Sequence, residues 1–280
     1  MRPRMPILSI TLLILIRIAA PAFSQPTVTV TGGAIKGAVL EQGGVVFKGI
    51  PYAAPPVGDL RWREPQPVQT WSGVRDATAA GPSCQAQEDC LYLNVWNAEW
   101  PVSKKSKPVM LWIHGGGNFG GTSLTASWDG ESLSRRDVIV VGANYRLGIF
   151  GFFAHPALTK ESPRHASGNY GLMDQIAAMR WIQANIKQFG GDPNNVTVFG
   201  ESAGSMDINM LMASPLTKGL VQRVIELRFS CSFSSGVALE AHAASRFSFA
   251  LNPRPPGVRE GAEYASRRRA VARSRGSARS

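Results

Sequence analysis

The chain has 280 residues, 44% apolar and 18% charged, with 29 glycines and 19 prolines, a composition that can bury a core and excludes a wholly disordered chain or a collagen-like repeat. The formal net charge is +11, but residues 1–17 carry +3 of it and residues 228–280 carry +7. The nearly neutral centre therefore gives no reason to expect a nucleic-acid partner for the folded part.

The first 24 residues have the order of a secretory signal peptide. Basic residues precede an apolar run at 7–16, and mostly small residues follow at 19–24. The run is about ten residues long, whereas spanning a bilayer takes about 20. We expect cleavage after Ala22 or Ser24, which predicts a secreted or periplasmic protein with no stable membrane insertion. An uncleaved anchor and an ordinary apolar N-terminus are the alternatives.

Residues 25–227 contain strand patterns followed by an alternation of strand and helix. Thr27–Leu40, broken at two glycines, predicts a hairpin. Leu91–Trp96 alternates, whereas two later runs are continuously apolar, which is typical of strands covered on both faces. Besides the hairpin, the expected strands are Val45–Ile50, Leu91–Trp96, Val109–His114, Val138–Tyr145 and Val196–Phe199.

One long helix is predicted between the last two strands. Apolar residues recur at helical spacing over Leu172–Phe189, and Gly190-Gly191 ends the pattern. Strand, strand, helix, strand, helix is the order of an α/β fold with a largely parallel central sheet.

A glycine-flanked serine follows the last predicted strand directly. The sequence Gly200-Glu201-Ser202-Ala203-Gly204 has the Gly-x-Ser-x-Gly form of a nucleophile elbow, and apolar Met206–Met212 predicts a buried helix after it. In so sharp a turn the glycines relieve clashes with neighbouring backbone, and the serine is presented at the apex. The alternative is a glycine-rich turn with a helix-capping serine.

A second glycine motif, His114-Gly115-Gly116-Gly117, ends the strand that begins at Val109. Runs of this kind supply the second element of an oxyanion hole, because glycines let backbone N–H groups turn toward a developing negative charge. One such donor contributes roughly 3–4 kcal/mol of transition-state stabilisation. We expect His114 itself to make a fold-stabilising hydrogen bond rather than to act as a base.

These motifs and several further blocks resemble the N-terminal half of a type-B carboxylesterase, the family of bacterial esterases, vertebrate carboxylesterases and cholinesterases. The resemblance implies an incomplete α/β-hydrolase fold, in which an antiparallel hairpin precedes a mostly parallel central sheet. It also implies a serine carboxylesterase that acts on a small-molecule carboxylic ester without a metal or organic cofactor. The further matching blocks are residues 47–53, 88–95, 144–148, 168–175, 190–204 and 214–216.

The resemblance also assigns roles to individual residues. Ser202 falls at the acylated nucleophile, and the oxyanion-hole N–H groups fall on Gly116, Gly117 and Ala203. Glu201 falls where the family places a buried acid near the catalytic histidine, although a satisfied structural carboxylate is the alternative.

Cys84 and Cys90, six residues apart, fall at the family's first disulfide. An exported protein would permit this bond, and two reduced thiols are the alternative. The third cysteine, Cys231, is left over.

A histidine and a carboxylate that would activate the serine are not recognisable. After Ser202 the only histidine is His242, and no strand pattern precedes Glu226, Glu240 or the later acids. Loss of triad members typically costs about 10⁴-fold to 10⁶-fold, so we expect a chain with little or no activity. A non-catalytic, cholinesterase-like binding protein and a truncated pseudogene product are the alternatives. The sheet would also stop beside the serine-bearing strand, and we expect its exposed edge to promote aggregation.

Residues 228–280 form a segment of a different composition. They contain ten Arg, ten Ser and ten Ala but no Lys or Asp, and neither a helical nor a strand period. We interpret this segment as disordered or out-of-frame, with a basic arm that binds nucleic acid or membrane as the alternative. The predicted organisation is a signal peptide at 1–24, a partial catalytic domain at 25–227 and this tail.

Overall fold

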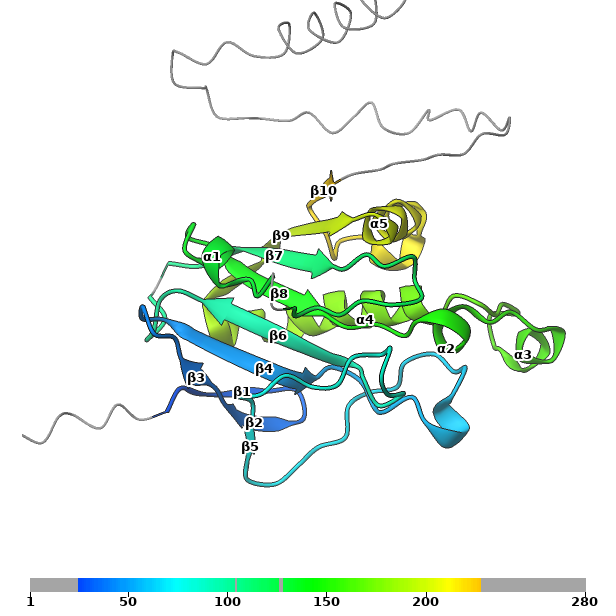
Figure 1. The fold of residues 1–280 in the computed structure, drawn as a ribbon, viewed down its shortest axis with the longest axis horizontal. Coiled ribbons are helices and arrows are strands. Elements are labelled where there is room, and N and C mark those ends of the chain that lie inside the picture. The colour runs from blue at the N-terminus through cyan, green and yellow to red at the C-terminus, as the bar shows by residue number, and fades with distance from the viewer. Residues whose placement is uncertain (1–24, 104, 126–127, 228–280) are drawn as a thin grey trace, which may run out of the picture. The chain divides into compact units, whose positions relative to one another are not determined.

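The computed structural model describes residues 25–103, 105–125 and 128–227 (Figure 1). The predicted signal peptide and the arginine-rich tail lie outside the described residues. Within the described part, no helix has the length and apolar character needed to cross a membrane.

A mixed sheet of seven strands forms the centre of the described residues. The four strands from β10 to β8 run parallel, and those from β8 to β3 pair antiparallel. The predicted α/β class is confirmed, and the parallel half contains the strands that lead into both glycine motifs. In order across the sheet the strands are β10 (Arg223–Leu227), β9 (Gly191–Glu201), β7 (Lys107–Ile113), β8 (Ile139–Ala143), β6 (Tyr92–Asn97), β4 (Val45–Pro51) and β3 (Ala38–Val39).

The N-terminal hairpin belongs to a separate, smaller sheet. Strands β1 (Thr27–Val30) and β2 (Gly33–Lys36) pair antiparallel as predicted, and β5 (Val74–Asp76) pairs parallel with β2. The hairpin does not extend to Leu40, because the chain crosses to the large sheet at Gly37. A Cβ at that glycine would lie 2.5 Å from the carbonyl oxygen of Val46, so only glycine permits this close crossing.

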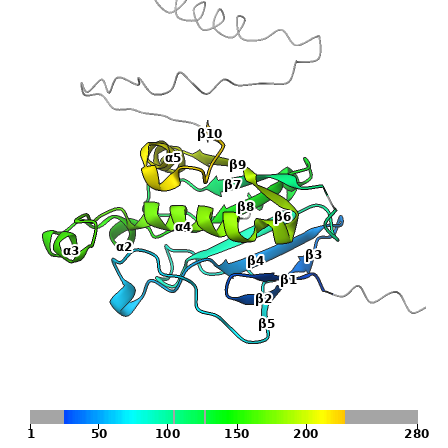
Figure 2. The same ribbon diagram turned by 180° about the vertical axis from the view of Figure 1, so that it is seen from behind.

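Helix α4 (Tyr170–Asn185) lies along one face of the large sheet (Figure 2). It confirms the predicted helix, which continues as the 3₁₀ turn η2 (Ile186–Phe189) and ends where Gly190 takes a φ of 83°. Its apolar side packs on the main core. The remaining helical elements are η1 (Gly58–Leu60), α1 (Glu131–Ser134), α2 (Gly148–Phe152), α3 (Pro156–Glu161), α5 (Ala203–Ala213) and η3 (Pro215–Thr217).

Aromatic side chains cover the opposite face of the sheet. Trp128 lies against Trp96 with ring centroids 5.9 Å apart and against Trp112 at 5.0 Å, and Trp112 contacts Phe199. Strand β6 is therefore buried on both faces, although its sequence alternates, because loop residues cover the side that the alternation left open.

Two expectations near the C-terminal end of the described part are wrong. The sheet does not stop at β9, because β10 pairs parallel with it through residues 223–227. Helix α5 forms where predicted but is not wholly buried, since Met206, Met210 and Met212 are about 40–50% exposed. The exposed edge is therefore β10, whose residues are mostly exposed.

Candidate active site

Ser202 lies at a sharp turn between β9 and α5. Its backbone has φ 55° and ψ −120°, a conformation that non-glycine residues seldom adopt and that stores strain. Its side chain is exposed, whereas Ala203, Gly204 and Ser205 after it are buried. The predicted strand–turn–helix setting is thus present, with the serine at the apex.

The glycines of this turn permit a close approach to the end of β7. A Cβ at Gly204 would lie 2.2 Å from the carbonyl oxygen of Ile113, and a Cβ at Gly200 would lie 2.9 Å from the same atom. Any larger residue at these two positions would have to displace the backbone, so the glycines of the turn determine where Ser202 lies.

The glycine motif that follows β7, which we call the glycine loop (residues 114–117), lies beside this turn. A Cβ at Gly115 would lie 3.2 Å from the Cβ of Ser202 and 2.9 Å from Oε2 of Glu201. Gly116 and Gly117 have φ values of 111° and 64°, which favour glycine. The fold thus brings together the two motifs, although 87 residues separate Gly115 from Ser202 in the sequence.

Three backbone donors of this region have no partner within the described part of the chain. None of the hydrogen bonds found there uses the N–H group of Gly116, Gly117 or Ala203 as a donor. The half-buried carboxylate of Glu201 likewise makes no hydrogen bond or ion pair with any described residue. Free N–H groups next to a serine are able to stabilise negative charge on a bound oxygen.

His114 is buried at the start of the glycine loop. Its ring stacks on Tyr145 with centroids 4.4 Å apart, and its Nδ1–H donates to the carbonyl oxygen of Gly115 at 2.8 Å. This is a local hydrogen bond of the kind predicted for it. Nε2 is buried and has no partner among the described residues. Burial lowers the pKa of His114 to about 4, so the ring is neutral at neutral pH.

A neutral buried histidine makes stability fall with acid. The unfolded His114 takes up a proton near its ordinary pKa of 6.5, whereas the folded one resists until about pH 4, so the contribution is lost between these two values. We expect a loss of roughly 3 kcal/mol across this window, from 1.36 kcal/mol per unit. Urea unfolding from pH 7.5 to 4 should show it in the parent chain. In His114→Gln this pH-dependent loss of stability should be absent. The same dependence of the free energy of unfolding on pH in the parent chain and in His114→Gln would contradict the assignment of the loss to His114.

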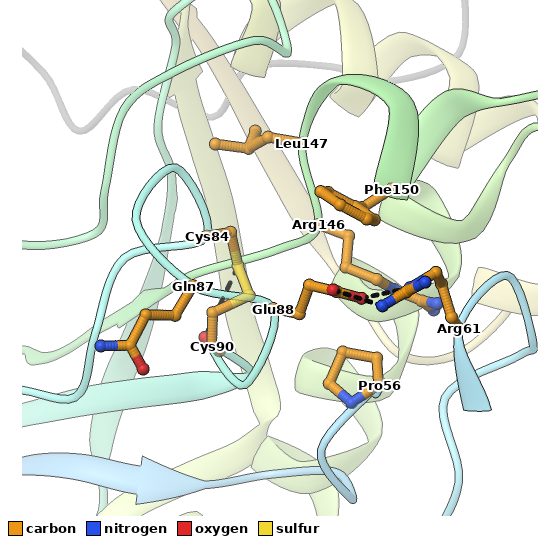
Figure 3. Close-up of a pocket in the computed structure, with 9 residues that line it drawn as sticks. All are labelled: Pro56, Arg61, Cys84, Gln87, Glu88, Cys90, Arg146, Leu147 and Phe150. Atoms are coloured by element: carbon orange, nitrogen blue, oxygen red, sulfur yellow. Dashed lines mark hydrogen bonds and ion pairs between the residues drawn. A yellow bond between two sulfur atoms is a disulfide. The ribbon is translucent and has the colours of Figure 1, made fainter. Parts of the chain in front are cut away.

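The disulfide predicted between Cys84 and Cys90 is present, with an S–S distance of 2.05 Å. It lines a narrow pocket together with the ion pair of Arg61 and Glu88 (2.6 Å) (Figure 3). Ser202 is not among the residues that line this pocket. No group of three potential metal ligands occurs in the described ranges.

Sequence reasoning missed two polar residues that join the glycine loop to α5. Asn118, directly after the loop, donates from its Nδ2 to Oδ1 of the buried Asp207 at 2.9 Å. The only signal in the sequence is an aspartate within an otherwise apolar helix pattern.

Comparison with known proteins gives a consistent picture. A sequence model described as "Carboxylesterase family" matches residues 24–250. The match extends beyond Leu227, the last residue that the structure describes. The chain is 49% identical over 206 residues to the fumonisin B1 esterase of Sphingopyxis macrogoltabida, covering 69% of this chain and 38% of that protein. It is 46% identical over 214 residues to the para-nitrobenzyl esterase of Bacillus subtilis, covering 71% and 42%.

Solved structures match over the same region. A para-nitrobenzyl esterase superposes with a TM-score of 0.66 at 46% identity, covering 72% of this chain and 43% of that one. A carboxylesterase of Geobacillus stearothermophilus superposes with a TM-score of 0.67 at 41% identity, covering 71% and 43%. The predicted α/β-hydrolase fold is thereby confirmed, and the chain spans about two fifths of the length of these relatives.

Proposed function

Because the chain belongs to the carboxylesterase family, we propose that it carries the nucleophile half of a serine esterase site. Ser202 Oγ attacks the carbonyl carbon of a small-molecule carboxylic ester and forms a tetrahedral intermediate. The N–H groups of Gly116, Gly117 and Ala203 donate to its oxyanion. The alcohol then departs with the serine proton, and water hydrolyses the acyl-enzyme to release the acid and restore the hydroxyl.

One observation carries the proposal: the exposed Ser202 lies beside the start of the glycine loop, where a Cβ at Gly115 would be 3.2 Å from the serine Cβ. The next two glycines, Gly116 and Gly117, have N–H groups with no hydrogen-bond partner in the described part. Electrostatic stabilisation of an oxyanion needs fixed donors next to the attacking oxygen. A glycine-rich turn with a capping serine would not need a second glycine loop beside it. The side chain of Ser202 also makes no cap hydrogen bond to α5.

We propose a low reaction rate for the described part of the chain, because a serine hydroxyl needs a general base and no hydrogen bond joins the Ser202 side chain to a histidine or carboxylate there. Glu201 directly precedes Ser202 in the turn, and we propose that it tunes the electrostatics of the site rather than activates the serine. The residual rate would then come from the oxyanion donors, about 10⁴-fold to 10⁶-fold below that of a complete triad. We further propose export of the chain, which the disulfide supports.

The test is slow covalent labelling of the purified chain with a fluorophosphonate, located by mass spectrometry of peptides. We expect an adduct on the peptide that contains Ser202 and none in Ser202→Ala. Ser205→Ala is the matched control, because this neighbouring hydroxyl is buried and donates to the carbonyl oxygen of Gly200 at 2.7 Å; it should keep the adduct. No adduct in the parent chain, or one that persists in Ser202→Ala, would favour a non-catalytic binding protein.

A further inference from the structure

Asp207 is a buried acid on the helix that begins at the serine turn. Its side chain is fully buried among the apolar residues of α5. Oδ1 accepts a hydrogen bond from Nδ2 of Asn118 at 2.9 Å, and Oδ2 accepts one from Nε2 of Gln175 on α4. The carboxyl group thus joins α4, α5 and the segment after the glycine loop.

No cation within the described ranges pairs with this acid. Burial raises the pKa of Asp207, while the hydrogen bonds from Asn118 and Gln175 lower it. A buried carboxyl group without a positive partner is costly to the fold. A role in stability alone would be served as well by an apolar residue of similar size, so the position of the group indicates another role.

Asn118 is the residue through which the loop is held. Its φ is 61°, its carbonyl oxygen accepts from the N–H of Gly148 at 2.6 Å, and its Oδ1 accepts from the hydroxyl of Tyr145 at 3.1 Å. The single hydrogen of this hydroxyl is shared with the carbonyl oxygen of His114, which is the closer acceptor at 2.7 Å. These contacts fix both ends of the segment that contains Gly116 and Gly117.

We propose that Asp207 is a positioning residue that fixes the glycine loop through Asn118, so that the N–H groups of Gly116 and Gly117 face Ser202. The proposal rests on the proposed function for its effect on reactivity, but the positioning itself does not depend on it. Asp207 and Ser202 lie five residues apart on the same turn and helix. The hydrogen bond between Asp207 and Asn118 therefore holds the glycine loop against α5, the helix that begins next to Ser202. A displacement of about 1 Å at such a site costs on the order of 100-fold in rate.

The test uses the full chain and three variants. Asp207→Ala removes both accepted hydrogen bonds and is expected to slow phosphonylation of Ser202 about 10-fold to 100-fold. Asp207→Asn is expected to stay within about threefold of the parent, because its carbonyl oxygen still accepts from Gln175 and its amide can donate to Asn118. Gln175→Ala is the matched control: it removes the other donor to the same carboxyl group and more side-chain volume than Asp207→Ala does, yet it should label within about threefold of the parent.

Hydrogen exchange measured by mass spectrometry supplies a readout that does not need reactivity. We expect peptides covering residues 114–121 to exchange at least tenfold faster in Asp207→Ala, with β8 unchanged, and to exchange at the parent rate in Gln175→Ala. An unchanged loop in folded Asp207→Ala, or equal acceleration in Gln175→Ala, would overturn the positioning role. If the parent chain is not labelled but exchange responds as expected, the proposed function fails while the positioning role stands.

Discussion

Replacing Gly204 with alanine is expected to slow phosphonylation of Ser202 about 100-fold and to lower the free energy of unfolding by about 1–3 kcal/mol. The added Cβ would lie 2.2 Å from the carbonyl oxygen of Ile113 and 3.0 Å from that of His114. Both are backbone atoms at the end of β7 and cannot rotate away. The start of α5 must therefore move off the sheet and take Ser202 away from the glycine loop.

The control variant Gly219→Ala separates the steric effect of a Cβ at Gly204 from the effect of backbone strain. Gly219 has a φ of 82°, and a Cβ there would meet nothing within 4 Å, so the variant should lose about 1–2 kcal/mol through strain alone. Its labelling rate should equal that of the parent chain. Urea unfolding and the labelling time course measure both quantities in the same samples. A Gly204→Ala chain that labels at the parent rate would show that the close contact between the turn and β7 does not fix the serine.

The parts of the fold that follow from local pattern could be predicted from the sequence. Apolar periodicity predicts the strand that precedes Ser202 and the long helix that precedes this strand, because it reflects which face each element buries. The pairing of the two glycine motifs followed only from resemblance to a family. No periodicity indicates that residues 115 and 202 lie close together. They are brought together by the parallel pairing of β7 with β9, which forms between segments distant in the sequence.

The errors have a common cause in contacts that the local pattern does not encode. The edge strand β10 contains Arg223 and Glu226 and is mostly exposed, so it has no apolar run to predict it, and its pairing with β9 forms it. The exposed methionines of α5 look like core residues in composition. No local pattern indicates the contact of Asp207, because its partner, Asn118, lies 89 residues away.

Asp174→Ala is expected to lower the free energy of unfolding by about 3–5 kcal/mol, because it leaves a buried guanidinium without its anion. The side chains of Arg146 and Asp174 are 2% and 0% exposed. Nε and Nη2 of the arginine each donate to the carboxylate at 2.8 Å, and the backbone N–H of Arg146 donates at 3.0 Å. After the substitution, a contact with the ring of Tyr170, 5.4 Å from the guanidinium carbon, remains.

Two variants test that the cost comes from the unpaired buried charge. Glu161→Ala breaks an exposed ion pair with Arg63 and should change the free energy of unfolding by less than about 1 kcal/mol. The double variant Arg146→Met, Asp174→Leu removes both charges and should recover most of the loss. A double variant less stable than Asp174→Ala would contradict this account. Because Arg146 follows Tyr145, whose hydroxyl donates to the carbonyl oxygen of His114, this ion pair also supports the start of the glycine loop.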